Sequence, residues 1–251
     1  MDITFDKKTA LVTGAGSGLG FLFSKCFAEL GGKVLLVDIN EDSLKDRTDE
    51  INAIKPDSAA YSVCDVRNYD QVCAARDTAV EKFGSVDVLV NFAGGAEIRM
   101  CNVSGKELPD VPIEVYDWGI DVNLKGQMYF DHAVLKQMRE QKSGVIINIG
   151  SITGEEGCSG NMAYASSKSA AMNGLTKSIA KYGAKYNIRC CCVSPGPVLT
   201  RPGMAAMRTA LGRAAEPQEL VDLVLFVASD RSAFLTGVNI LSDGGRNILG
   251  R

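Results

Sequence analysis

Short apolar runs alternate with longer amphipathic segments along the 251-residue chain. Runs of branched apolar residues bounded by turn residues are typical of buried strands, whereas apolar positions three and four apart predict helices. The expected strands are 9–13, 33–38, 59–64, 86–95 (ending in a turn), 144–150 and 238–245, with another strand through Cys190, Cys191 and Cys192. The expected helices are 21–30, 41–54, 68–83, 112–141 and 163–186, and a further helix begins near 216.

Strands that alternate with helices predict a parallel sheet covered on both faces. We therefore expect an α/β fold, a doubly wound (Rossmann) domain with a mostly parallel sheet of about seven strands. The chain shows no linker, composition break or internal repeat, so residues 1–251 are expected to form a single domain. Ligands bind beyond the carboxyl ends of such strands, and the loops after the strands should gather there.

A glycine-rich loop follows the first strand. The segment GAGSGLG (14–20) lies between that strand and the first helix, which is the context that gives a glycine motif its meaning. Gly14 permits a tight turn, while Gly18 and Gly20 let the backbone approach a pyrophosphate at the helix N-terminus. The spacing is G-x3-G-x-G. The sequence thus predicts a dinucleotide site.

The second strand ends at Asp38, eighteen residues after Gly20. A carboxylate at this place can accept hydrogen bonds from the adenosine ribose hydroxyls and repels a 2′-phosphate. No arginine or lysine lies within the glycine loop or at 39–40 to neutralise such a phosphate. We therefore expect NAD rather than NADP. The alternative interpretation of Asp38 is a turn residue at a strand end.

A serine, a tyrosine and a lysine carry the candidate chemistry. Ser151 closes the strand 144–150, Tyr164 follows thirteen residues later, and Lys168 follows Tyr164 by four. Residues four apart on a helix share a face, so the phenol and the ammonium should lie together. A free tyrosine has a pKa near ~10, and a neighbouring cation favours the phenolate. The pair can therefore transfer a proton, with Ser151 holding the atom that receives it.

Composition narrows the function classes. The formal net charge of −3 and the lack of a basic stripe argue against nucleic-acid binding. No apolar run approaches the length of a membrane span, and the first residues lack the layout of a signal peptide. We expect a cytoplasmic protein that acts on a small molecule, with neither nucleic acid nor membrane as partner.

The eight cysteines and the one histidine do not form a metal pattern. No Cys-x-x-Cys pair occurs, and consecutive Cys190, Cys191 and Cys192 should point to alternate faces of a strand as buried free thiols. His132 lies in a helical run without a second imidazole, so we expect a histidine on a helix surface or in the core. No metal site is expected.

Over its whole length the chain resembles the short-chain dehydrogenase/reductase family in its ~250-residue form. The matching pieces occur in the family's order: TGAGSGLG (13–20), Asp38, Asp65-Val66, NFAG (91–94), Asn123, Ser151, Tyr164, Lys168 and PGPVLT (195–200).

The resemblance implies roles for these residues. Tyr164 would be the general acid/base, Ser151 would hydrogen-bond the same substrate oxygen, Lys168 would contact the nicotinamide ribose and lower the pKa of Tyr164, and Asn123 would hold a water that links Lys168 to solvent. The implied cofactor contacts are Gly14, Ser17, Gly18, Leu19, Gly20, Asp38, Ile39, Asp65, Val66, Asn91, Ala93, Gly94, Tyr164, Lys168, Pro195, Gly196, Val198 and Thr200.

Three stretches depart from the family pattern. Phe92 replaces the usual second asparagine of NNAG. The segment 95–117 is long and is expected to be an exposed loop near the substrate, or equally a surface insertion without a role. The substrate loop, about 200–212, is short and suggests an open pocket or one completed by a neighbouring subunit.

Glu155 and Glu156 either bind hydroxyl groups or a cationic substrate, or are solvated turn carboxylates, which we favour.

These observations favour an oxidoreductase that transfers hydride between NAD(H) and a secondary alcohol or ketone, such as a polyol, a sugar-derived alcohol or a steroid. One alternative is a 3-oxoacyl-[acyl-carrier-protein] reductase, against which Asp38, Glu155 and Glu156 count. A second alternative is an NAD-binding scaffold or sensor. The resemblance also implies a homotetramer or homodimer, with the helices 112–141 and 163–186 packed across a two-fold interface.

Overall fold

The computed structural model describes residues 3–249, and all its strands lie in one seven-stranded sheet. The strands are β1 (Thr9–Thr13), β2 (Lys33–Asp38), β3 (Ala59–Val63), β4 (Val88–Asn91), β5 (Gly144–Ile149), β6 (Ile188–Pro195) and β7 (Asn239–Ser242). Their order is β3-β2-β1-β4-β5-β6-β7, and every pairing is parallel. The order reverses between β1 and β4, which is where a doubly wound sheet opens a ligand crevice.

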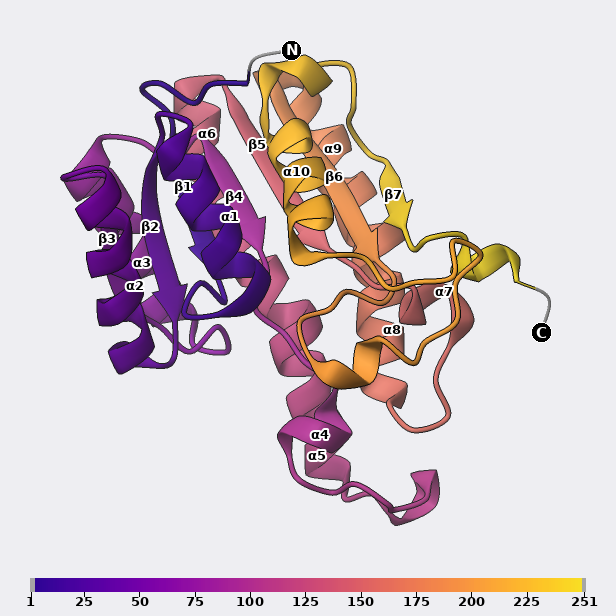
Figure 1. Cartoon of the computed structure of the whole chain (residues 1–251). Helices are drawn as coiled ribbons and strands as arrows, with labels where there is room; N and C mark the ends of the chain where they lie inside the picture. Colours follow the sequence, from indigo (N-terminus) through magenta and orange to yellow (C-terminus); the bar gives the residue numbers. More distant parts are fainter. Residues whose placement is uncertain (1–2, 250–251) are drawn as a thin grey trace.

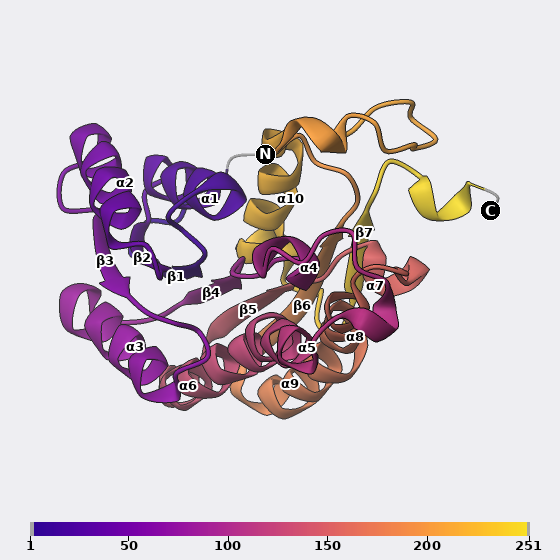
Figure 2. The same cartoon turned by 90° about the horizontal axis from the view of Figure 1, so that it is seen from below.

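Helices cover both faces of the sheet (Figures 1 and 2). One face carries α1 (Gly18–Glu29), α2 (Glu41–Ile54) and α10 (Pro217–Ala228), and the other carries α3 (Tyr69–Phe83), α6 (Gly126–Gln141) and α9 (Thr176–Gly183). The shorter helices α4 (Glu97–Met100), α5 (Ile113–Ile120), α7 (Thr153–Glu156) and α8 (Met162–Ala170) lie toward the carboxyl ends of the strands. The predicted doubly wound fold is confirmed.

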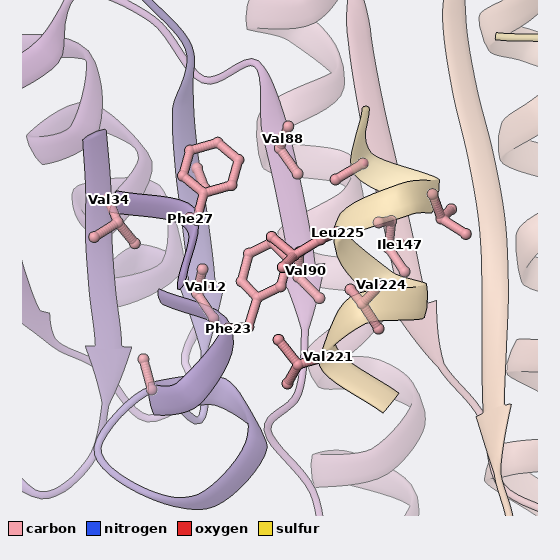
Figure 3. Packing of buried hydrophobic residues seen from close by; sticks show 14 of the residues in the cluster. Val12, Phe23, Phe27, Val34, Val88, Val90, Ile147, Val221, Val224 and Leu225 are labelled. Atoms are coloured by element: carbon pink, nitrogen blue, oxygen red, sulfur yellow. The ribbon is translucent and has the colours of Figure 1, made fainter. Parts of the chain in front are cut away.

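Alternate residues of the central strands enter two separate cores. Val12 and Val90 pack under α1 and α10 against Phe23 (Figure 3). Their strand neighbours Leu11 and Leu89 face α3 and α6 instead. Because successive side chains of a strand point to opposite faces, continuous apolar runs fill both layers.

The predicted strand through the three consecutive cysteines is confirmed in β6. Cys190 belongs to the core under α6 and α9, whereas Cys191 belongs to the core under α1 and α10. Cys192 is also fully buried, and all three are free thiols. Consecutive thiols of β6 therefore point to opposite faces of the sheet, as expected.

The two long predicted helices each contain a π-helical turn. Asp121–Lys125 joins α5 to α6, and Ala171–Leu175 joins α8 to α9. Such turns insert one residue into the helical repeat and are frequent at functional sites. Within residues 3–249, no helix is both long enough and apolar enough to cross a membrane.

Candidate active site

A cleft of about 700 Å³ lies beyond the carboxyl ends of the strands. It is lined by the loops that follow the six strands β1 to β6. Of the residues predicted for cofactor and catalysis, the lining contains Gly14, Ser17, Gly18, Leu19, Gly20, Asp38, Ile39, Asp65, Val66, Ala93, Gly94, Ser151, Tyr164, Lys168, Pro195, Gly196, Val198 and Thr200. The structure thus brings together segments that are far apart in sequence.

The glycine loop lets the backbones of two strand ends approach closely. Gly14 has a φ of +66°, and a Cβ there would lie 2.8 Å from the backbone nitrogen of Ala93. A Cβ on Gly20 would lie 2.3 Å from the carbonyl oxygen of Gly14. Ser17 caps α1 without a side-chain hydrogen bond, and the first-turn residues Gly18, Leu19 and Gly20, whose N–H groups have no partner within residues 3–249, line the cleft. This cradle of unpaired donors suits a diphosphate.

Asp38 ties the glycine loop to the end of β2. Its side chain accepts hydrogen bonds from the backbone N–H groups of Gly16 at 3.1 Å, Ile39 at 2.8 Å and Asn40 at 3.1 Å. Asp38 is therefore a turn residue at the strand end, as the alternative interpretation states. Asp38 nevertheless also lines the cleft, so the turn places its carboxylate where an adenosine ribose is expected.

Arg67 follows β3 and lines the cleft beside Asp65. The spacing of the predicted strands gave no indication of this cation. Its guanidinium binds both carboxylate oxygens of Asp65, with a shortest contact of 2.6 Å. The Arg67 hydrogen bond lowers the pKa of Asp65. The pair therefore lines the cleft near Asp38 with its charges balanced.

Ser151 and Tyr164 come together from β5 and α8. Ser151 is buried and accepts a hydrogen bond from the Thr153 backbone N–H at 3.1 Å. Burial raises the pKa of Tyr164, and hydrogen bonding to Ser151 and the charges of Arg201 and Arg99 act in the opposite direction. Desolvation disfavours a phenolate, so nearby cations decide whether this tyrosine can act as a base.

Lys168 lies one helical turn below Tyr164. Its Nζ is 5.6 Å from the centroid of the Tyr164 ring and donates to the carbonyl oxygen of Ile149 at 2.6 Å. The side chain is only 3% exposed, and burial lowers its pKa to about 8. The amino group thus lies beside the Tyr164 ring, where a positive charge favours a phenolate.

Asn123 sits in the π-helical turn and is fully buried behind the cleft wall. Its side chain accepts from the N–H of Gly95 and donates to the carbonyl oxygens of Gly95 and Gly119, each at 2.9 Å. These bonds fix the loop after β4 against α5. The residues that line the cleft, within 3–249, do not include Asn123 itself.

The side chain of Asn91 makes its contacts beneath the cleft, and its implied cofactor contact stays a prediction. As the last residue of β4 it points away from the cleft, and its amide donates to Asp131 at 2.8 Å and to Asn148 at 2.9 Å. Among residues 3–249 the cleft lining includes Ala93 and Gly94 but not Asn91. Asn91, Asp131 and Asn148 thus form a buried polar cluster beneath the site. Burial raises the pKa of Asp131 in this cluster to about 7.

Comparison with known proteins settles the family. A family model described as short chain dehydrogenase matches residues 8–210. The chain belongs to the short-chain dehydrogenase family. A solved short-chain type dehydrogenase/reductase from Mycobacterium marinum superposes with a TM-score of 0.89 at 31% identity, covering 98% of this chain and 97% of its own.

Curated relatives of this short-chain dehydrogenase differ in substrate. It is 37% identical to trans-4-hydroxycyclohexanecarboxylate dehydrogenase of Sinomonas cyclohexanicum, over 95% of this chain and 92% of the relative. It is 36% identical to 3-oxoacyl-[acyl-carrier-protein] reductase of Thermotoga maritima, over 95% and 97%. It is 38% identical to 3-alpha-(or 20-beta)-hydroxysteroid dehydrogenase of Mycobacterium tuberculosis, over 95% and 88%. All are oxidoreductases by name, so the reaction class is oxidation and reduction.

Phe92 has a packing role in this short-chain dehydrogenase. Its ring lies 5.9 Å from the ring of Phe23 on α1, centroid to centroid, and the residue packs against the core under that helix. The aromatic contact thus joins the loop after β4 to the helix that follows the glycine loop.

The segment 95–117 is not simply an exposed loop, so that prediction is wrong for its first part. Residues Glu97–Met100 form the helical turn α4, and Glu97 is fully buried. Its two carboxylate oxygens accept from the backbone N–H groups of Ala163 at 2.9 Å and Tyr164 at 3.1 Å. Glu97 therefore caps the start of α8, where Asn161 offers no side-chain cap. A lone acid in a stretch without periodicity gave no signal of this contact.

Replacing Glu97 with alanine is expected to lower the free energy of unfolding by about 1–3 kcal/mol, because two buried N–H groups lose their acceptor. It should also reduce kcat more than it changes KM, since Tyr164 is one of the two residues held. Chemical denaturation and steady-state kinetics measure both effects.

Two further variants serve as controls for the Glu97→Ala experiment. Glu97→Gln keeps one acceptor and should fall between wild type and Glu97→Ala, while Glu107→Ala removes an exposed acid from the same segment and should change neither quantity. An unchanged kcat in a folded Glu97→Ala protein would contradict a positioning role for this carboxylate.

Only a few residues of the segment after Thr200, within the part that the structure describes, line the cleft. It makes a 3₁₀ turn at Pro202–Met204, and Arg201, Met204 and Met207 join the lining. The expected substrate loop 200–212 is thus present at the cleft only in its first part.

Glu155 and Glu156 do not face the cleft. Glu155 is exposed, in line with the favoured interpretation, whereas Glu156 forms an ion pair with Arg246 at 2.9 Å. Both line a separate shallow depression beside α7 and α8. The hypothesis that they bind hydroxyl groups or a cationic substrate in the main cleft has no support in this geometry.

Proposed function

We propose that this protein is an NAD-dependent oxidoreductase that interconverts a secondary alcohol and its ketone, with Tyr164 as the general acid/base. The observation that carries the proposal is the convergence of Ser151, Tyr164 and Lys168 on one cleft with an open glycine cradle. An NAD-binding scaffold has no use for a buried ammonium beside a half-buried phenol. The intact set therefore favours catalysis.

The glycine loop, Asp38 and the loop after β4 would hold the dinucleotide. A bound nicotinamide supplies the hydride acceptor or donor. In oxidation Tyr164 accepts the hydroxyl proton at its phenolate oxygen, and Ser151 orients the substrate oxygen. Lys168 stabilises the phenolate electrostatically, and in reduction the proton moves from Tyr164 to the substrate. Such acid/base help is typically worth about 10²–10⁴-fold in rate.

The adenosine end supports NAD over NADP. Asp38 lines the cleft at the end of β2, where its carboxylate would repel a 2′-phosphate, because like charges at short range repel. Arg67 also lines this end, but Asp65 holds its guanidinium in a bidentate ion pair. That pair uses the Nε and Nη2 groups and offsets the charge with which Arg67 would attract a 2′-phosphate.

A panel assay tests the reaction class. The purified protein is incubated with NAD⁺ and 4-hydroxycyclohexanecarboxylate, a 3-hydroxysteroid or a polyol, and NADH formation is followed by absorbance. A 3-oxoacyl thioester with NADPH forms the opposing arm. We expect NADH from at least one alcohol. Turnover confined to the thioester with NADPH would favour the reductase alternative, and no turnover in either arm would favour the scaffold.

We further propose that the chain works as one domain, in the cytoplasm, as a homotetramer or homodimer. Three buried free thiols on β6 suit a reducing compartment. Apolar side chains of Phe234, Val238 and Ile248 remain exposed around the edge strand β7, which is surface that a second copy would cover. Light scattering of the purified protein measures the subunit number.

A further inference from the structure

Two arginines reach the substrate end of the cleft from different segments. Arg99 lies in α4, and Arg201 follows β6 in the short substrate loop. Figure 1 shows α4 and the orange segment after β6 both beyond the carboxyl ends of the strands. A Cβ added to Gly95 would lie 3.5 Å from the Arg99 Nη2, so this guanidinium folds back over the loop after β4.

Neither guanidinium has an acidic partner or a side-chain hydrogen bond among residues 3–249. The contrast with the other end of the cleft is clear, because Arg67 there is neutralised by Asp65. Two unpaired cations that line one cavity favour the binding of an anion in that cavity. The planar guanidinium groups suit a carboxylate, which can accept two parallel hydrogen bonds.

The substrate end of the lining, within the described chain, contains no carboxylate of its own. The two acids in the lining, Asp38 and Asp65, both belong to the adenosine end. The nearby Glu97 is fully buried, with one hydrogen bond to each of its oxygens. The Glu97 charge opposes the effect of the two arginines on Tyr164, but within residues 3–249 no carboxylate forms an ion pair with either guanidinium.

The anion would lie close to the reacting oxygen. Both guanidinium groups act to lower the pKa of Tyr164, which burial raises. The remaining surface is largely apolar: Met100, Trp118, Val122, Ile152, Met204 and Met207 line the same end. A ligand that matches this surface has an apolar body, a reacting hydroxyl or carbonyl near Tyr164, and an anionic group within reach of both arginines.

We infer that Arg99 and Arg201 bind a carboxylate of the substrate, which is therefore an apolar hydroxy acid or the matching keto acid. The redox part of this statement rests on the proposed function. The binding part does not, because an anion site can be measured without turnover.

The test uses an unreactive probe. Cyclohexanecarboxylate has an apolar body and a carboxylate but no hydroxyl, and cyclohexanecarboxamide is its neutral counterpart. Both are titrated calorimetrically into the full-length protein and into Arg99→Gln, Arg201→Gln and Arg208→Gln. Arg208 is an exposed arginine of the same loop that lies outside the lining. NAD⁺ is titrated into each protein in parallel.

We expect wild type and Arg208→Gln to bind the carboxylate at least about 10-fold more tightly than the amide, and each cleft variant to lose about 10-fold in carboxylate affinity. Equal binding of acid and amide, or unchanged affinity in both cleft variants, would overturn the inference. Inorganic phosphate is titrated in the same way, and phosphate binding that is tighter than carboxylate binding and is lost in both cleft variants would overturn the carboxylate assignment. Failure of NAD⁺ to bind while the acid still binds through both arginines would contradict the proposed function alone.

Discussion

Replacing Tyr164 with phenylalanine is expected to lower kcat for alcohol oxidation by about 10²–10⁴-fold or more, with unchanged NAD⁺ affinity. The ring and its packing on α8 remain, whereas the oxygen that exchanges the proton is lost. Since no other phenol or imidazole lines the cleft within residues 3–249, nothing replaces that oxygen. Steady-state kinetics with the best substrate and calorimetry with NAD⁺ measure the two quantities separately.

Tyr182→Phe is the matched control, because that tyrosine is 39% exposed on α9 and lies outside the cleft. It should retain wild-type kcat. Turnover that survives in Tyr164→Phe at the level of this control would show that the proton is transferred by another group, and the mechanism would be wrong.

Replacing Lys168 with methionine is expected to reduce kcat/KM for oxidation by at least about 10²-fold at neutral pH. Methionine fills the buried side-chain space but carries no charge, so the phenolate of Tyr164 loses the cation that lies 5.6 Å from its ring centroid. An opposite charge at this range moves a pKa by about 1–3. Without the ammonium the pKa of Tyr164 rises, and the rising limb of the oxidation profile should move upward by about 1–3 pH units. The kcat/KM profile from neutral to alkaline pH measures this movement.

Lys177→Met serves as the control for charge removal, because Lys177 is exposed and its side chain donates, within residues 3–249, one hydrogen bond, to Asn173 at 3.0 Å. Its profile should match wild type. If Lys168→Met loses activity without any displacement of the profile, the lysine positions the substrate or cofactor and does not act on the pKa of Tyr164.

Much of the fold follows from local pattern. The strands β1 and β2 and the helix α2 end at the residues that sequence predicts, because apolar runs, turn residues and the Asn40 cap act locally. The grouping of Gly14, Asp38 and Ser151 was also predictable, since the carboxyl ends of parallel strands must meet at one edge.

The remaining features depend on how irregular segments fold, and no periodicity records that. Asn91 was expected in the cleft, but strand alternation turns its side chain toward Asp131. Glu97 and Arg99 lie in a stretch that lacks a helical or strand pattern, so their burial and convergence on Tyr164 follow only from tertiary contacts. Arg67 neutralises Asp65 through a turn that spacing alone does not specify.

The most direct test of the central claim is the affinity of the purified protein for NAD⁺ and NADP⁺, measured side by side by calorimetry. We predict that NAD⁺ binds at least about 10-fold more tightly, because the Asp38 carboxylate accepts ribose hydroxyls and repels a 2′-phosphate. Tighter binding of NADP⁺ would contradict the role given to Asp38 and move the 3-oxoacyl reductase to first place. Binding of neither nucleotide would contradict the assignment of the cleft as a dinucleotide site.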